Sequence, residues 1–292
     1  MTNKQKRELL KTFKLKAIKP SNAIQRDFYH KIAKITAEIN KSVSWWALAN
    51  IGKNIDKNTA KQLSIEFNKL LKEWNCKIKD SSKSIARRVA KQIQGYADLN
   101  IQRQLENTPL KDSAKTALAI TPPPVKQALT AHYEANLALI KTIPRDIIER
   151  YKQGFMQGIA NFDRETLLNL AKQYNGISHR RAKLIARDQV MKGISAYQNA
   201  RAQELGFKYY VWNTSQDERV SKGVGGHIHL NGRIYAYDNP TAIIDSYRNK
   251  GHCGQRVNCR CVATSIFLTP NQRLKLIKDS EHGDYYEIIE NS

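Results

Sequence analysis

The sequence predicts an α+β protein: a mostly helical, basic N-terminal body followed by a small C-terminal α+β module, in which one helix packs against a short antiparallel sheet. Apolar residues recur at helical spacing as far as about residue 175. Beyond Gly206, short runs rich in aromatic residues alternate in the manner of strands. We therefore place the body at residues 1–177, the module at 178–268 and a C-terminal tail at 269–292.

The helical body is predicted from its apolar stripes. Residues 21–106 contain three such stripes, of which the first comprises Phe28, Ile32, Ile35 and Ile39. Prolines end this block, and a second helical block runs from residue 125 to about 175. Pro144 lies inside it and predicts a new helix start, because proline suits the first position of a helix.

The module begins where Asn175-Gly176 predicts a turn and Ser178 a helix N-cap. Its helix is expected to end at Gly206. Three strands are then predicted at residues 207–212, 233–237 and 259–267. The last residues, 269–292, are polar and mixed in charge, which predicts one helix and a loose tail.

Charge is the strongest compositional signal. The 292 residues include 49 Lys and Arg against 26 Asp and Glu, a formal net charge of +23. The first 100 residues hold 22 basic and 8 acidic residues, a net charge of +14. We expect a polyanionic partner, double-stranded DNA bound without sequence preference. The excess argues against an ordinary metabolic enzyme, and we expect no small-molecule substrate.

The distribution of apolar residues and the number of cysteines argue against a secreted, a membrane-spanning and a disulfide-rich protein. The N-terminus lacks the continuous apolar centre of a secretory signal, and no window has the roughly 18 apolar residues of a membrane span. We therefore expect a soluble protein with no membrane partner. Four cysteines are too few for a disulfide scaffold and indicate folding in a reducing compartment.

The module also contains an ordered set of polar, aromatic and cysteine residues. These are Arg187, Asp188, Arg201, Trp212, Asp217, Arg219, His227, Asn258, Cys259, Arg260 and Cys261. In this order and spacing, residues 180–265 resemble the phage Mu F-like head morphogenesis family, minor capsid proteins encoded next to the portal protein of tailed phages. Two features depart from the family pattern: residues 222–226 look like a small insertion, and Arg256 stands where a proline is common.

The resemblance implies a structural protein of the virion, encoded by a phage or prophage. It would act in head morphogenesis, in the capsid interior or at the portal vertex, after assembly in the host cytoplasm. Its implied partners are the portal, the major capsid protein or a scaffold protein. We accordingly interpret the eleven residues as a structural signature and expect no catalytic residue, no metal and no cofactor.

A nuclease or toxin-like activity is the alternative function. Asp217, Arg219 and His227 supply an acid, a cation and an imidazole, which could cleave a phosphodiester without a metal, and His229 offers a second proton-transfer group. We prefer a structural role, in which Asp217 and Arg219 hold the loop and His227 caps their network. Polar clusters that hold irregular loops are commoner than active sites.

A zinc site is the second alternative. Cys259 and Cys261, with Cys253, His252 or His227, provide enough ligands. Structural zinc sites usually contain two close cysteine pairs, whereas this chain has one. We therefore prefer two reduced cysteines that share one face of a strand and pack as small apolar side chains.

The predicted helix of the module also carries charges toward both of its ends. Arg187 and Arg201 are fourteen residues apart and so lie roughly on one face. We expect this face to pack over the sheet, where Arg187 or Arg201 would form a partly buried ion pair with Asp217.

Overall fold

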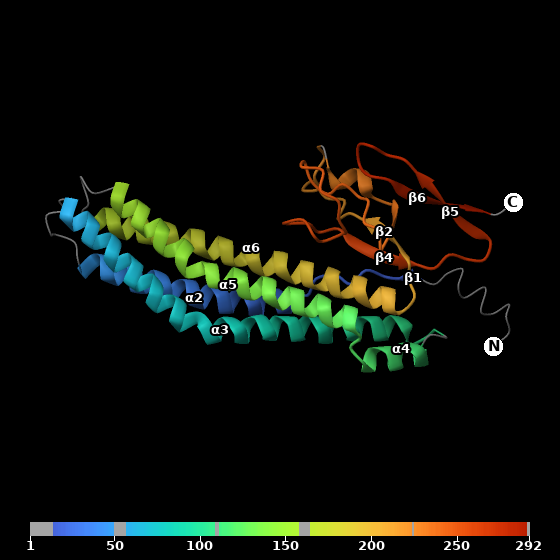
Figure 1. The fold of residues 1–292 in the computed structure, drawn as a ribbon, viewed down its shortest axis with the longest axis horizontal. Coiled ribbons are helices and arrows are strands. Elements are labelled where there is room, and N and C mark those ends of the chain that lie inside the picture. Colours follow the sequence, from blue (N-terminus) through green and yellow to red (C-terminus); the bar gives the residue numbers. More distant parts are fainter. Residues whose placement is uncertain (1–13, 50–56, 109–110, 158–163, 224, 291–292) are drawn as a thin grey trace. The chain divides into compact units, whose positions relative to one another are not determined.

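The computed structural model describes residues 14–49, 57–108, 111–157, 164–223 and 225–290. Long helices precede five strands of a six-stranded antiparallel sheet, whose remaining strand comes before the helices, and this confirms the predicted α+β class (Figure 1). The helices are α2 (Asn22–Ala49), α3 (Lys57–Leu105), α4 (Lys111–Ala119), α5 (Pro123–Gln157) and α6 (Arg164–Glu204). The strands are β1 (Lys14–Leu15), β2 (Tyr209–Asn213), β3 (Ile234–Ala236), β4 (Val262–Ile266), β5 (Gln272–Ile277) and β6 (Tyr285–Glu290), and a 3-10 helix, η1, covers His227–Leu230.

The chain forms two compact units. The helical unit comprises the described residues of Asn22–Val89 and Tyr133–Arg187. The sheet unit comprises those of Met1–Ser21, Ala90–His132 and Asp188–Ser292. This division differs from the one predicted at residue 177/178, because α3, α5 and α6 each contribute residues to both units.

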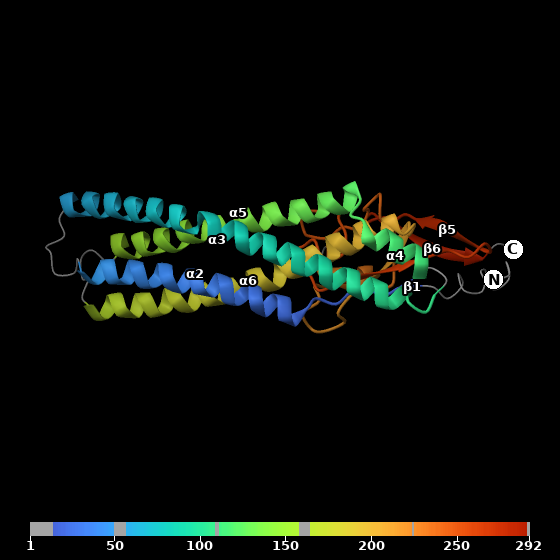
Figure 2. The same ribbon diagram turned by 90° about the horizontal axis from the view of Figure 1, so that it is seen from below.

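The helical unit is a bundle in which α2 lies alongside segments of α3, α5 and α6 (Figure 2). The predicted first stripe is its core: Phe28, Ile32 and Ile39 are fully buried, and Ile35 nearly so. Each such side chain contributes about 1.5–3 kcal/mol by leaving water. Among the described residues, no helix has an apolar stretch long enough to cross a membrane.

Two predicted helix boundaries are wrong. Pro144 lies inside α5, with Ile143 and Ile147 buried on either side of it. Ser178 is not an N-cap but a buried residue within α6, one turn before the buried Ala182. Gly176, two residues before Ser178, also lies inside α6. In the interior of a helix, proline costs about 3 kcal/mol and glycine about 1 kcal/mol relative to alanine. Burial of the neighbouring turns offsets both.

The sheet has the strand order β1-β4-β2-β3-β6-β5, with every neighbouring pair antiparallel. The three predicted strands are confirmed as β2, β3 and β4. Tyr210 and Trp212 of β2 are fully buried, as the alternation of that segment requires. The predicted helix end is also confirmed: α6 stops at Glu204, and Gly206 adopts a left-handed φ of +88°.

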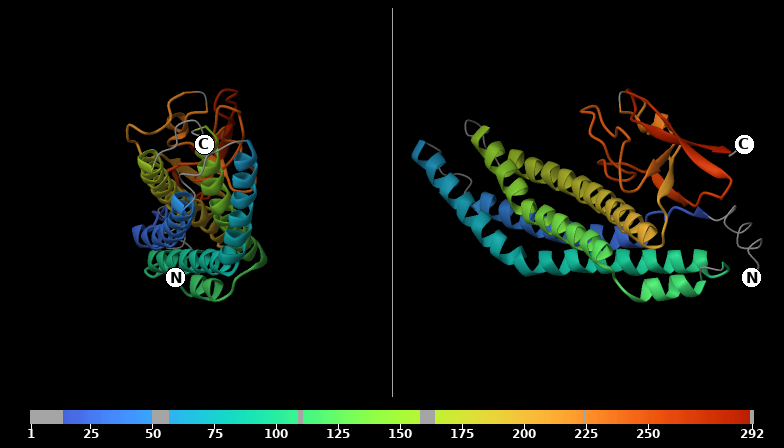
Figure 3. Two further views of the ribbon diagram at one scale, coloured as in Figure 1. Left: turned by 90° about the vertical axis from the view of Figure 1, so that its left-hand side faces the viewer. Right: turned by 45° about the vertical axis from the view of Figure 1, so that its right-hand side comes forward.

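The predicted C-terminal tail is wrong, because residues 272–290 form the hairpin β5–β6 (Figure 3). The hairpin joins the sheet where Ile234 of β3 pairs with Tyr286. Asp279 fixes its loop: one carboxylate oxygen accepts the backbone N–H of His282 at 2.8 Å, and the other lies 2.7 Å from Arg233. The alternation of Arg273, Leu274, Lys275 and Leu276 was the strand signal in this segment.

The C-terminal half of α6 packs against the sheet, as the sequence predicts for the helix of the module. Gln198 is buried there and donates to the carbonyl oxygen of Ala263 in β4 at 3.1 Å. The side-chain oxygen of Gln198, Oε1, accepts the backbone N–H of Ile18, just after β1, at 3.0 Å. One amide side chain therefore connects the helix, a central strand and the N-terminal segment.

Candidate functional site

Three buried side chains converge in the sheet unit. His227 begins η1, whereas Cys259 and Cys261 precede β4. The Nδ1 atom of His227 lies 3.4 Å from Sγ of Cys259 and 3.3 Å from Sγ of Cys261. All three candidate ligand atoms lie within 4.8 Å of one another. We call these three residues the HCC cluster.

The imidazole of His227 has a defined orientation. Its Nε2 atom lies 3.0 Å from the carbonyl oxygen of Ile244, which can only accept, so Nε2 carries a proton. Nδ1 is therefore the ring nitrogen directed at the two sulfurs. The backbone N–H of His227 donates to Oγ of Ser221 at 3.0 Å, and the Trp212 ring packs edge-on against the imidazole at 5.4 Å. Both contacts fix the ring.

The thiols of Cys259 and Cys261 differ in pKa. A hydrogen bond from Cys261 lowers the pKa of the Cys259 thiol well below its ordinary value, and His227 lowers it further. The same hydrogen bond, together with burial, raises the pKa of Cys261. The pair on its own therefore favours one thiolate, on Cys259, beside one protonated thiol.

Asp188 of α6 positions the loop that carries the cysteines. Its Oδ1 atom accepts the backbone N–H of Asn258 at 2.8 Å, and its Oδ2 atom lies 2.9 Å from Nζ of Lys192. Asn258 has a φ of +62°, a left-handed conformation that asparagine tolerates better than most residues. This turn directs the following Cys259 toward His227.

A second contact with α6 lies at Gly254, which has a φ of +81°. A Cβ atom built on Gly254 would lie 2.8 Å from Cβ of Ser195, so a side chain would clash as well as strain the backbone. Ser195 donates to the carbonyl oxygen of Cys253, and the Gly254 N–H donates to Sγ of Cys259 at 3.4 Å. The close approach of loop and helix thus places a backbone donor on the sulfur.

Asp217 and Arg260 form a two-pronged ion pair on the exposed side of this loop. Nη2 of Arg260 lies 2.6 Å from Oδ1 of Asp217, and Nη1 contacts Oδ2. The guanidinium lowers the pKa of the Asp217 carboxyl. Asp217 also accepts the backbone N–H of Arg219 at 3.0 Å. The prediction that Arg187 or Arg201 pairs with Asp217 is therefore wrong: the partner is Arg260, between the two cysteines.

Arg201 is 1% exposed and holds helices together elsewhere in the sheet unit. Its Nε atom lies 3.2 Å from Oδ1 of Asp98 and 3.0 Å from the Tyr197 hydroxyl. Its Nη1 atom donates to the carbonyl oxygens of Ala117 and Ile120 at 3.1 and 3.0 Å. Arg201 thus connects α6 with α3 and the end of α4, and its acidic partner comes 103 residues earlier in the chain.

The signature residues therefore separate by location. Asp188, Trp212, Asp217, His227 and the Asn258–Cys261 segment build the HCC cluster and its loop. Of the remaining three, Arg201 belongs to the helix network and Arg187 to the helical unit, whereas Arg219 lines the cavity beside the cluster.

The HCC cluster adjoins a cavity of about 210 Å³. Its lining includes the three cluster residues and the polar side chains of Arg219, Arg256 and Arg260. The wall is completed by Ser215, Val220, Ser221, Val257 and Asn258. The cluster is thus buried on the side of Trp212 and bordered by a polar space on the other.

The model of the family described as Phage Mu protein F like protein matches residues 145–264, a range that contains all eleven signature residues. Residues 145–264 are a Mu F-like segment. The resemblance predicted from the signature residues is confirmed. The match indicates a phage head-related protein.

A second comparison gives a match of greater length. The chain is 32% identical over 154 residues to an uncharacterized protein of Haemophilus influenzae. Those residues are 52% of this chain and 32% of that protein, so the chain spans about a third of the relative's length. No solved structure matches the chain significantly.

The helical part of the Mu F-like segment contributes to a cationic hollow of about 420 Å³ in the helical unit. Four of its lining residues carry positive charge: Arg26 of α2 and Arg180, Lys183 and Arg187 of α6. Gln25, Tyr29, Leu184 and Ala186 complete the lining. We call this the cationic groove.

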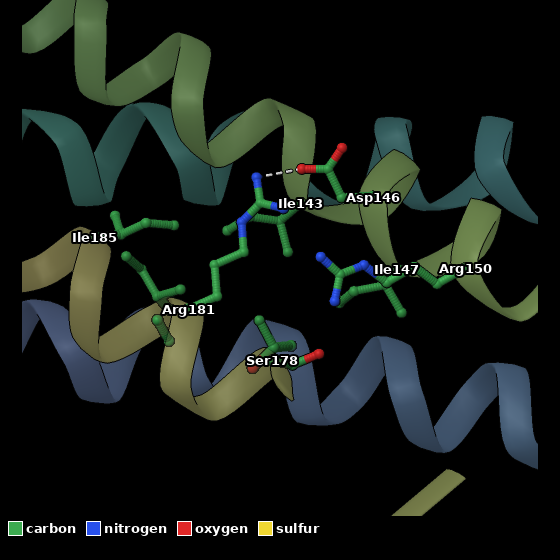
Figure 4. Close-up of a pocket in the computed structure, with 10 residues that line it drawn as sticks. Ile143, Asp146, Ile147, Arg150, Ser178, Arg181 and Ile185 are labelled. Carbon is green, nitrogen blue, oxygen red and sulfur yellow. Dashed lines mark ion pairs between the residues drawn. The ribbon is translucent and has the colours of Figure 1, made fainter. Parts of the chain in front are cut away.

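A second, smaller cavity of the helical unit holds about 20 Å³, space for roughly one water molecule. Figure 4 shows Arg181 of α6 reaching toward Asp146 of α5 beside it, and the two form an ion pair. Ile143, Ile147 and Ile185 supply apolar walls. Its size and lining indicate a packing defect closed by an ion pair, and not a ligand site.

Proposed function

We propose that this protein is a minor head protein of a tailed phage or prophage. It acts in head morphogenesis at or near the portal vertex, inside the capsid, after assembly in the host cytoplasm. The observation that carries the proposal is the Mu F-like match over residues 145–264 in a chain with a net charge of +23. A few copies per particle associate with the portal, the major capsid protein or a scaffold protein.

Contact with packaged double-stranded DNA is the second part of the proposal, and the cationic groove supports it. Two helices, α2 and α6, place four positive side chains around one hollow. Phosphate contacts of this kind carry no sequence information, and they make affinity fall steeply with salt. The groove therefore binds DNA of any sequence through its backbone.

The protein acts by association and not by chemistry. Asp217 is engaged by Arg260 and by the Arg219 backbone, whereas His227 contacts Ile244 and the two cysteines. The acid and the imidazole of the alternative nuclease hypothesis thus have separate partners. We propose no catalytic residue and no small-molecule substrate.

The DNA part is tested by measuring affinity for duplexes of unrelated sequence across a salt series. The affinity of the unmodified chain should be independent of sequence and should fall by orders of magnitude between about 50 and 200 mM salt. Replacing the four groove cations together by glutamine should lower the slope of log affinity against log salt by about 3 to 4. No binding at low salt would contradict DNA contact.

The control is a chain with four exposed cations of α3 replaced by glutamine: Lys61, Lys72, Lys79 and Arg87. Both variants lose the same charge, so only a local groove makes the first variant weaker than the second. Equal losses would refute the groove as the contact surface.

The head-protein part is tested by co-expression with the neighbouring portal and capsid genes, where the chain should co-purify with heads at low copy number. Its absence from assembled heads would refute this part.

A further inference from the structure

We propose that the HCC cluster is a Zn²⁺ site with three protein ligands, Nδ1 of His227 and the sulfurs of Cys259 and Cys261, and an open fourth position on the cavity. A tetrahedral zinc ion with Zn–S near 2.3 Å and Zn–N near 2.0 Å separates its nitrogen and sulfur ligands by about 3.6 Å. The two N–S distances here are 3.4 and 3.3 Å. The ligand atoms therefore need to move apart by only a few tenths of an ångström.

The ligand types fit zinc and exclude the common hard cations. Two thiolates and an imidazole are typical zinc ligands, whereas Mg²⁺ and Ca²⁺ prefer oxygen. Two thiolates also balance the charge of Zn²⁺, so that the metal-bound cluster is neutral in a buried place. Without a metal, one of the two sulfurs keeps its proton, and only a hydrogen bond from this weak S–H donor links the two sulfurs.

The groups around the ligands are arranged as outer-sphere partners of a metal. The Nε2 proton of His227 is donated to the carbonyl oxygen of Ile244, the usual device that directs the other ring nitrogen at a metal. The Gly254 N–H donates to Sγ of Cys259. Such donors stabilise the negative charge on metal-bound sulfur.

Trp212 supplies an independent observation. Its side chain is fully buried, and among the described residues its indole N–H has no partner with hydrogen-bond geometry. A buried N–H without a partner costs about 1–3 kcal/mol. The indole packs edge-on against the imidazole of His227, with ring centroids 5.4 Å apart, so the indole lies beside the cluster. A metal held by two thiolates there would place permanent negative charge close to this donor.

The fourth position is open to solvent or to a partner's side chain. Cys253 is fully buried nearby, but its sulfur is not part of the group whose ligand atoms lie within 4.8 Å. His252, the other candidate from the sequence, is instead bonded through Nδ1 to the Tyr210 hydroxyl at 3.0 Å. The polar cavity of about 210 Å³ borders the three ligands and accommodates a water ligand.

The site explains why the cysteines are two residues apart with an arginine between them. Cys259 and Cys261 both face His227, while Arg260 points away to pair with Asp217. Zinc would thus fasten η1 to the segment that enters β4 from the inside, and the ion pair fastens the same segment from the outside. The metal is a structural clamp on this loop.

The test is metal analysis of the full-length chain, purified under reducing conditions and titrated with Zn²⁺ alone. We expect one zinc per chain, removable by a chelator and restored by Zn²⁺. Cys259→Ser, Cys261→Ser and His227→Gln should each abolish stoichiometric binding. Trp212→Phe, which removes the indole N–H together with part of the buried ring, should weaken affinity about tenfold.

The matched controls are Cys76→Ser, which removes the exposed cysteine of α3, and Cys253→Ser. Both should retain one zinc per chain, and loss of zinc from Cys253→Ser would overturn the three-ligand assignment. Titration of the unmodified chain with Co²⁺ requires no variant to fold. It should give the visible bands of tetrahedral Co²⁺ together with a thiolate-to-cobalt band in the near ultraviolet. Substoichiometric zinc with no thiolate band would overturn the proposal.

Discussion

The backbone N–H of Asn258 donates to Oδ1 of Asp188 across 70 residues of chain, at 2.8 Å. This bond joins α6 to the loop of the HCC cluster at the residue whose left-handed backbone turns the loop. Both residues belong to the signature read from the sequence, and the bond gives a reason for their joint presence. One carboxylate on a rigid helix sets where the first cysteine of the cluster lies.

Asp188→Ala should therefore destabilise the sheet unit. The change leaves the Asn258 N–H without an acceptor and the Lys192 ammonium without its partner, a loss of about 1–3 kcal/mol in the free energy of unfolding. Denaturant unfolding measures the loss, and hydrogen exchange should show it concentrated at residues 253–261. Asp188→Asn, which keeps the acceptor oxygen, should lose clearly less. Equal losses in both variants would contradict the bond as the cause.

A second prediction concerns Gly193, which lies where α6 passes close to α3 and α5. A Cβ atom there would lie 2.5 Å from Cδ1 of Ile93 and 2.6 Å from Nε2 of His132. In Gly193→Ala, overpacking should lower the free energy of unfolding by about 1–3 kcal/mol. This loss should outweigh the roughly 1 kcal/mol of stability that a helix gains when alanine replaces glycine. Gly95→Ala in α3 is the control, because no atom lies within 4 Å of its Cβ position. That variant should be slightly more stable, and both are compared by thermal unfolding.

A third prediction concerns acid stability. Burial lowers the pKa of His132 to about 4 from its ordinary value of 6.5. Between these two values the unfolded chain binds a proton at His132 and the folded chain does not, so stability rises with pH. The contribution is present above pH 6.5 and is lost as the pH falls toward 4, a loss of roughly 3 kcal/mol at most.

The measurement is the free energy of unfolding at several values between pH 7 and 4. His132→Leu should flatten this dependence, leaving a smaller slope of the same sign from His252, whose pKa is also lowered by burial. The exposed His30 provides the control, and His30→Gln should retain the full slope. A slope unchanged by His132→Leu would contradict the assignment.

Local sequence patterns predicted the helices and strands, because the formation of these elements depends largely on residues close together in the chain. The stripe from Phe28 to Ile39, the alternation of β2 and the helix end at Gly206 each follow from short-range spacing. The same local reasoning failed at Pro144 and Ser178. There, tertiary burial of adjacent turns outweighs a local preference for ending the helix.

Partners distant in sequence were not predictable from such patterns. Nothing in residues 14–15 indicates that they pair with β4, some 250 residues later. Charge complementarity alone offered Asp217 two arginines, Arg187 and Arg201, whereas the fold brings Arg260 to it. In the site, spacing did predict that Cys259 and Cys261 share a face, but it left His227 and His252 equivalent. The hydrogen bonds to Ile244 and Tyr210 distinguish the two histidines.

The last prediction concerns Arg201, whose charge is almost completely buried and is opposed by Asp98. Removing one member of a buried, hydrogen-bonded pair costs about 3–5 kcal/mol, because the other charge is left uncompensated. Arg201→Met also leaves two carbonyl acceptors, those of Ala117 and Ile120, without their donor. Arg201→Met should therefore lower the free energy of unfolding by an amount within or above that range.

The reciprocal variant, Asp98→Asn, should cost less than Arg201→Met. Arg201 keeps its bonds to Tyr197 and to both carbonyl oxygens, and burial already raises the pKa of the Asp98 carboxyl, which shows that its charge is held at some cost. The double variant should recover part of the loss, since it buries neither charge alone. Denaturant unfolding of the four chains gives the coupling energy directly. If the two single losses simply add, Arg201 stabilises the fold through its bonds to Tyr197 and the two carbonyl oxygens, and its pairing with Asp98 contributes nothing.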